Sequence, residues 1–279
     1  MPWPQPYTKH HDLQLGAIHA HVPEAGAGAP AIFLHGNPDT HAVWNTTIAA
    51  LPQLRCLAPD LPGFGKSTAP DDHDLSLDAQ AAFVLGIADA LRLDRVHVVV
   101  HDIGGNYGLA FAALHPERVA SLTVFNTIWS PSYRWHFWGR VWRTQGLGEA
   151  AMKLSIRPLF INQIRRGSKA MPRDYMELAF AEFTPATKRH VLRYYRAMSP
   201  PVWQGWDTKL LAAKLKTQVI WGDHDPFIPP RFASGFGVAP RHTPHGHWLM
   251  AEDPQLAANA IADFTERVSG NSSKSLPSM

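Results

Sequence analysis

An acidic residue, Asp102, stands where a short apolar run gives way to two glycines. The run Val98–Val100 is β-branched, as is typical of a buried strand, and from Gly104 onward the apolar residues take up helical spacing. The sequence therefore predicts a strand, a sharp turn and a helix, with Asp102 on the turn. A carboxylate there can cap the helix that follows, because acids are favoured at helix N-termini, or it can act as an exposed nucleophile.

The type of nucleophile limits the reaction. A serine that attacks a saturated carbon leaves an ether, which a nearby base does not readily hydrolyse. A carboxylate that attacks the same carbon leaves an ester, and water can open its carbonyl through an oxyanion intermediate. Asp102 is therefore suited to alkyl transfer rather than acyl transfer, and this two-step reaction needs no metal or organic cofactor.

Two later segments carry residues for the second step. Asp225 follows a predicted strand, where it could orient a histidine and stabilise its imidazolium; a turn-forming aspartate is the alternative. Near the C-terminus we expect His247 to be the base, because it follows a glycine and precedes an aromatic residue, while His245 is a nearby competitor. The two histidines could also join a metal site, but no C-x-x-C or H-E-x-x-H motif accompanies them.

An early apolar run ends in the segment His35-Gly36-Asn37-Pro38. A backbone N–H of this segment could pair with that of Ile103, directly after Asp102, to hold a negatively charged oxygen. An ordinary Gly-Pro turn is the alternative.

The elements that must position these residues alternate between strand and helix. Helices are predicted over Leu77–Leu93, with Ser76 as its N-cap, and over Leu256–Val268. Strands are predicted at Ala31–Leu34, Cys56–Pro59, Val96–Val100, Leu122–Phe125 and Val219–Trp221, with a short one near Arg241. This alternation predicts an α/β fold with a mostly parallel, doubly wound sheet.

The alternation stops at residue 127 and resumes near residue 217. Between Ile128 and Lys209 there are 14 Lys and Arg against 5 Asp and Glu, a net charge of +9, and six of the ten tryptophans. We expect a helical cap over 128–210, inserted into a core formed by 1–127 and 211–268, with a disordered tail over 269–279. Because ligands bind at the carboxyl ends of strands in such sheets, the cap should cover the site and contact substrate.

Composition narrows the class of protein. A chain of 279 residues with 45% apolar residues can bury a core, and its single cysteine, Cys56, is expected to be a buried thiol. No stretch approaches the ~20 apolar residues of a membrane span, no signal core is present, and no nucleic-acid motif accompanies the basic residues, so we expect a cytoplasmic protein acting on a small molecule. The oligomeric state is left open, and a homodimer is compatible with the sequence.

Together these segments resemble the α/β-hydrolases that use an aspartate nucleophile, the epoxide hydrolases and haloalkane dehalogenases. The resemblance covers Ala31–Phe264. It implies an α/β-hydrolase fold with a helical cap, and the chain order nucleophile, acid, base also matches. The residues that carry it are His35-Gly36-Asn37-Pro38, His101-Asp102-Ile103-Gly104-Gly105, Asp225 and Gly246-His247-Trp248.

The two branches of that family differ in how they treat the leaving group. Haloalkane dehalogenases resemble this chain at Asn37, whose side chain would hold the halide. They place a tryptophan directly after the nucleophile, however, where this chain has Ile103, so a cap residue such as Trp129 or Trp138 would have to substitute.

Epoxide hydrolases use two cap tyrosines to bind the ring oxygen. The segment around Tyr195 resembles the one that carries the second of these, and Tyr133 matches the first, with His136 as a substitute. The sequence therefore predicts an epoxide hydrolase, with a haloalkane dehalogenase and a non-catalytic binding protein as alternatives. The tryptophans of the cap indicate an apolar pocket, whereas Arg134, Arg140 and Arg143 would allow a substrate with a carboxylate.

Overall fold

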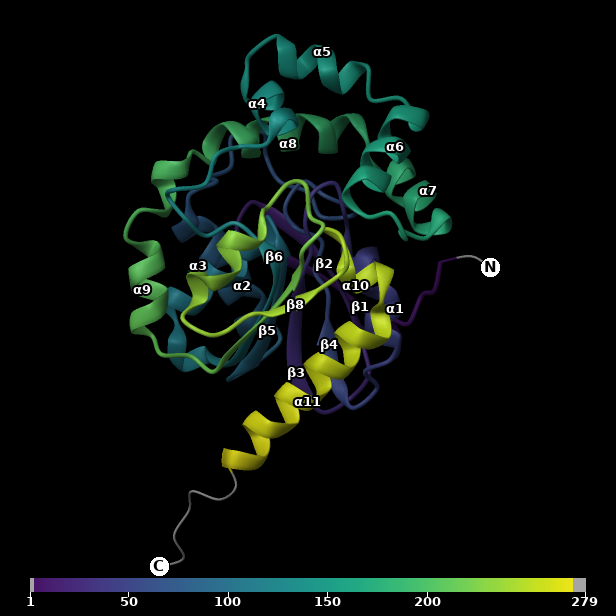
Figure 1. Ribbon diagram of the computed structural model, residues 1–279. Coiled ribbons are helices and arrows are strands. Elements are labelled where there is room, and N and C mark those ends of the chain that lie inside the picture. Colours follow the sequence, from purple (N-terminus) through teal and green to yellow (C-terminus); the bar gives the residue numbers. More distant parts are fainter. Residues whose placement is uncertain (1–2, 273–279) are drawn as a thin grey trace, which may run out of the picture.

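The computed structural model describes residues 3–272, and its centre is one mostly parallel sheet (Figure 1). Strands β1 and β2 form an antiparallel hairpin, β2 also pairs antiparallel with β4, and the remaining pairs are parallel. The strand order is β1-β2-β4-β3-β5-β6-β7-β8. The strands are β1 (Lys9–Leu15), β2 (Ile18–Ala25), β3 (Ala29–Leu34), β4 (Leu54–Leu57), β5 (Val96–Asp102), β6 (Val119–Thr127), β7 (Thr217–Gly222) and β8 (Arg241–Thr243).

Helices cover both faces of the sheet. Helices α2, α3 and α9 lie on one side, and α1, α10 and α11 lie on the other (Figure 1). The helices of the described residues are α1 (Asn45–Ala49), α2 (Leu77–Ala90), α3 (Gly104–Leu114), α4 (Phe137–Arg143), α5 (Leu147–Lys153), α6 (Arg157–Gly167), α7 (Arg173–Glu182), α8 (Pro185–Ala197), α9 (Trp206–Ala212), α10 (Leu249–Glu252) and α11 (Pro254–Ser272).

Strand β5 occupies the middle of the sheet, and every one of its residues is buried. A strand covered on both faces is expected to be continuously apolar and β-branched, and Val98–Val100 has that character. At the start of α2 the Ser76 hydroxyl accepts a hydrogen bond from the Ala79 N–H at 3.2 Å, so the predicted N-cap is present. The predicted α/β fold class is confirmed.

The sequence analysis missed the hairpin of β1 and β2. Strand β1 has the sequence KHHDLQL, and its residues are exposed or half-buried because it lies at the edge of the sheet. A polar edge strand lacks the apolar run by which the other strands were recognised.

The predicted disordered tail is wrong at its start. Helix α11 continues through Ser272, and the Ser269 hydroxyl donates to the Thr265 carbonyl at 2.9 Å, which satisfies a polar side chain within the helix. The rest of that prediction, 273–279, lies outside the described residues.

Helices α4–α8 form a layer above the carboxyl ends of the strands (Figure 1). They stand between β6 and β7 in the chain, whereas α9, in the same interval, packs on α3 of the core. We propose that α4–α8 act as the cap. Among the described residues, no helix combines the length and the apolar character that crossing a bilayer requires.

Candidate active site

Asp102 lies on a strained turn between β5 and α3. Its φ of 46° is in the left-handed region, which non-glycine residues rarely adopt, and its carbonyl accepts a hydrogen bond from the Thr127 hydroxyl at 2.6 Å. Small neighbours permit this turn. A Cβ at Gly104 would lie 2.4 Å from the His35 carbonyl oxygen, and one at Gly36 would lie 2.6 Å from the Cβ of Asp102. The strain and the close packing hold the carboxylate where a nucleophile would stand.

The Asp102 carboxylate is buried but has backbone donors. The Asn37 N–H donates to Oδ2 at 2.8 Å. Burial raises the pKa of Asp102, while the His247 charge and the N–H groups of Asn37 and Ile103 lower it. The two N–H groups predicted to hold an oxyanion therefore both act on this carboxylate.

His247 is paired with Asp225 in the loop after β7. The Nδ1 atom of His247 lies 2.7 Å from Oδ2 of Asp225. The other carboxylate oxygen accepts from the Phe227 N–H at 2.7 Å and from the Ile228 N–H at 3.0 Å. Because Asp225 is held by its own loop, it can fix the orientation of the imidazole ring.

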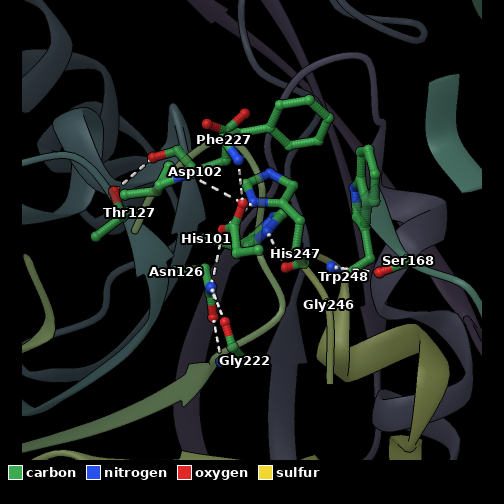
Figure 2. A network of polar contacts seen from close by, with 12 residues as sticks. His101, Asp102, Asn126, Thr127, Ser168, Gly222, Phe227, Gly246, His247 and Trp248 are labelled. Carbon is green, nitrogen blue, oxygen red and sulfur yellow. Dashed lines mark hydrogen bonds and ion pairs between the residues drawn. The ribbon is translucent and has the colours of Figure 1, made fainter. Parts of the chain in front are cut away.

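Asn126, at the end of β6, completes this arrangement, and the sequence analysis missed it. Its Nδ2 atom donates to Oδ2 of Asp225 at 2.8 Å and to the Gly222 carbonyl at 3.0 Å, and its Oδ1 accepts from the Gly222 N–H at 2.8 Å (Figure 2). Asn126 could have been found in the sequence, because it is a polar residue at the carboxyl end of a predicted buried strand. That strand lies beside the strand of Asp102.

The His247 ring lies between aromatic rings from two elements (Figure 2). Its centroid is 5.2 Å from that of Phe227 and 4.7 Å from that of Trp248, with nearly perpendicular planes. Its backbone N–H donates to the Gly167 carbonyl at the end of α6, at 2.8 Å. The cap therefore helps to position the imidazole.

The charge on His247 depends on the carboxylates around it. Burial by itself would lower the pKa of His247, but Asp225, Asp102 and Asp39 outweigh it and raise the pKa to about 9. The free site at neutral pH therefore holds an imidazolium between carboxylates. Removal of the Asp102 charge would make His247 a better proton acceptor.

One cavity of about 600 Å³ connects this site to the cap. Asp102, His247 and Asn37 line its floor, and Tyr195, His136 and Trp138 from the cap also line it. The structure thus brings together six residues that the sequence analysis had selected from distant segments.

Tyr195 projects from α8 and is packed among cap aromatics. Its ring centroid is 4.6 Å from that of Trp135 and 4.8 Å from that of Trp142. Asn37 Nδ2 approaches its hydroxyl oxygen at 3.5 Å, which leaves the Tyr195 proton free to donate. Burial raises the pKa of Tyr195 well above its ordinary value, so the proton is retained.

His136 caps α4, and this fixes its tautomer. Its Nδ1 atom accepts the Gly139 N–H at 3.2 Å, so in the neutral ring the proton is on Nε2. Burial and the charge on His247 lower the pKa of His136 to about 4. His136 is therefore a neutral N–H donor in the wall of the cavity.

Three predicted site residues do not line the cavity. The Tyr133 hydroxyl donates to the Phe227 carbonyl at 3.0 Å, and the residue is absent from the cavity lining. Trp129 packs against Trp206 outside the lining. His35 is buried beneath the turn, where Nδ1 contacts the Gly36 carbonyl at 2.8 Å and Nε2 accepts the Leu61 N–H at 2.9 Å. Each of these side chains has a packing role that sequence alone did not reveal.

The alternative ligands weighed from the sequence do not line the cavity either. His245 has only a distant carboxylate, 3.9 Å away at Asp253. Arg134 and Arg140 are outside the lining, and the Arg143 guanidinium donates to the Met198 carbonyl at 2.7 Å and to the Ser199 hydroxyl at 2.8 Å. Over residues 3–272, no group of three His, Cys, Asp or Glu side chains could hold a metal ion.

Comparison with known proteins agrees with this geometry. Residues 30–163 match the family model described as the alpha/beta hydrolase fold. A haloalkane dehalogenase of Mesorhizobium japonicum is 31% identical over 88% of this chain and 87% of its own length. An epoxide hydrolase of Caballeronia sordidicola is 34% identical over 40% of this chain and 35% of its own.

Solved structures share the fold. The haloalkane dehalogenase DbeA of Bradyrhizobium elkani superposes with a TM-score of 0.79 at 23% identity, covering 94% of this chain and 99% of its own. With this fold, this extent of similarity and this site, the chain is an α/β-hydrolase of the family that contains the epoxide hydrolases and haloalkane dehalogenases.

Proposed function

We propose that this enzyme hydrolyses epoxides to diols through a covalent ester on Asp102. The observation that carries the proposal is that Asp102, His247, Tyr195 and His136 line the same cavity. The first two groups supply nucleophile and base, and the last two supply hydrogen-bond donors for a leaving oxygen.

In the first step, a carboxylate oxygen of Asp102 attacks a ring carbon and the C–O bond of the epoxide breaks. The alkoxide that forms is a poor leaving group unless it is bound by donors. The Tyr195 hydroxyl and the His136 Nε2–H are both protonated at neutral pH, and one of them transfers or shares its proton with this oxygen.

In the second step, water attacks the carbonyl carbon of the ester. His247 takes the water proton, and Asp225 stabilises the imidazolium. The N–H groups of Asn37 and Ile103, which already act on the Asp102 carboxylate, hold the oxyanion. When this intermediate collapses, the ester C–O bond breaks and the departing oxygen takes the proton held by His247, which completes the diol. The acid proton left on Asp102 replaces the one that the cap donor gave in the first step, so the carboxylate is restored.

A haloalkane dehalogenase is the second candidate, because Asn37 and Trp138 line the cavity and both carry side-chain N–H groups. The covalent steps would be the same, with halide as the leaving group. Ile103 offers no side-chain donor beside the nucleophile, which favours the epoxide.

A trapping experiment tests both candidates. The His247→Gln variant should form the ester and fail to hydrolyse it, so intact-protein mass spectrometry after exposure to 1,2-epoxyhexane should find one adduct, and peptide mapping should locate it on Asp102. The double variant Asp102→Asn/His247→Gln is the control and should gain no mass. An adduct from 1-bromohexane but not from the epoxide would assign the enzyme to the dehalogenase branch.

A further inference from the structure

Cap helices α5 and α6 both contribute to the wall of the cavity, and the residues from α5 are apolar. Leu147, Ala150 and Ala151 of α5 line it, together with Leu154, the C-cap residue that directly follows the helix. Their spacing places them on one side of the helix. Leu147 is 53% exposed and Leu154 is 67% exposed. This apolar face of α5 is directed at the cavity instead of being buried against a neighbouring helix.

Exposed large apolar side chains gather at this cavity. Of the six found among the described residues, Phe137, Leu147, Leu154 and Leu159 line it, and Ile156 and Leu211 do not. Scattered exposed leucines need no explanation, but a contiguous group beside a pocket is typical of a binding groove. The group is continuous with Asp102 through the same cavity, so its occupant is the substrate itself.

Among the described residues, the same cavity offers no free cation that could bind a carboxylate of the substrate near the reacting carbon. Arg143 is used by the backbone of the cap, and Arg134 and Arg140 lie outside the lining. Arg166, on α6, is the only Lys or Arg that residues 3–272 contribute to the lining, and its side chain is exposed. The His247 imidazolium on the floor is already paired with Asp225, so it is not free to bind the carboxylate of a substrate. The part of the substrate near Asp102 is therefore neutral.

We propose that the substrate carries an unbranched apolar chain, which lies along α5 while its reactive end reaches Asp102. This inference rests on the proposed function for the nature of the reactive end. The stretch from Leu147 to Leu154 contains eight residues, and the seven steps between them span about 10 Å along the helix axis, so an alkyl chain on the order of eight carbon atoms would cover it. The substrate class is a medium- to long-chain alkyl epoxide, with the epoxide at or near the chain end.

The test is a chain-length series, from 1,2-epoxybutane through 1,2-epoxyoctane to 1,2-epoxydodecane, each below its solubility limit. Burial of a methylene contributes about 0.8 kcal/mol, which is a factor of about four in kcat/KM when the methylene is fully covered. Because the groove is partly open, we expect at least a tenfold rise from the butane to the octane derivative. A flat series would overturn the chain site.

Two matched variants test whether the dependence of kcat/KM on chain length arises at Leu154. Leu154→Ser alters an exposed side chain and should lower kcat/KM for 1,2-epoxydodecane about fivefold, while the value for 1,2-epoxybutane stays within about twofold. Ile156→Ser is the control, because Ile156 is 56% exposed in the same cap but outside the lining. Equal losses in the two variants, or equal losses for short and long epoxides, would contradict the proposal.

A binding measurement separates this inference from the proposed function. Calorimetric titration with 1,2-butanediol, 1,2-octanediol and 1,2-dodecanediol requires no turnover. If no epoxide reacts but diol affinity rises with chain length and falls in Leu154→Ser, the chain site is supported and epoxide hydrolysis is not. If short epoxides react and neither rate nor affinity depends on length, the enzyme is an epoxide hydrolase and the chain site is wrong.

Discussion

The floor of the cavity, lined by Asp102 and His247, and its roof, lined by residues of the cap, are built in different ways. On the floor, the Asp102 and Asp225 carboxylates accept backbone N–H groups, and the His247 imidazole pairs with Asp225. On the roof, Tyr195 is held mainly by aromatic packing, and exposed leucines of the cap line the same cavity. Backbone donors cannot be altered without refolding a loop, whereas packed side chains can be exchanged. In the mechanism that we propose, the floor therefore sets the covalent chemistry, and the roof sets which leaving group and which chain are accepted.

The sharpest test of the floor is Asp102→Asn, which keeps the side-chain shape and removes the nucleophile. We expect kcat/KM for epoxides to fall by about 10⁴-fold or more, as is usual for the loss of a covalent nucleophile. Diol formation followed by gas chromatography measures it. Retention of more than about a tenth of the activity would mean that water attacks the substrate directly and that Asp102 is not the nucleophile.

The roof is tested by a pair of tyrosine variants. Tyr195→Phe should slow alkylation by an epoxide about 10²-fold, because a donor to the leaving oxygen is lost. Tyr133→Phe loses the bond to the Phe227 carbonyl and the hydrogen bond with the His136 backbone, so its kcat/KM should stay within about threefold while its stability falls by about 1 kcal/mol. Single-turnover kinetics and denaturant titration give the two readouts. The reverse ranking of the two variants would show that the cap closes differently during the reaction.

Asn126→Ala tests whether the floor depends on its support as well as on its reactive groups. Asn126 donates to Asp225 and to the Gly222 carbonyl, so its loss should let Asp225 move and slow ester hydrolysis about tenfold. Alkylation should change much less, because Asp102 has no contact with this side chain among the hydrogen bonds of the site. Stopped-flow measurement of the two steps separates them, and equal slowing of both would indicate a general loss of folding.

The smallest effect concerns protonation. In the free enzyme the His247 imidazolium should titrate at about pH 9, and Asp102→Asn should lower this pKa, because a nearby negative charge is removed. The raised pKa also means that the charged pair stabilises the fold fully below about pH 6.5 and loses this contribution as the pH rises through about 9. NMR titration of the His247 ring gives the midpoints. Identical midpoints in the two proteins would show that Asp102 and His247 are not coupled.

The floor was more predictable from the sequence than the roof. Asp102 was recognisable because a buried strand, a turn and a helix follow one another within a few residues, and local sequence encodes that turn. His247 and Asp225 were found by their loops and by their order in the chain. Tyr133 was harder to assign, because a cap tyrosine has the same local sequence whether its hydroxyl binds a leaving group or donates to a backbone carbonyl, as it does here to Phe227.

By itself, the sequence determined that an aspartate occupies the turn after a central strand, that a base and an acid follow it, and that a basic, aromatic insert separates two strands. These are local properties of composition and spacing. The tertiary structure alone decided that Asn126 supports Asp225, that His136 and not Tyr133 lines the cavity, and that α5 directs its leucines at it. Those outcomes depend on how helices far apart in the chain pack together, and packing is set by contacts that no short segment contains.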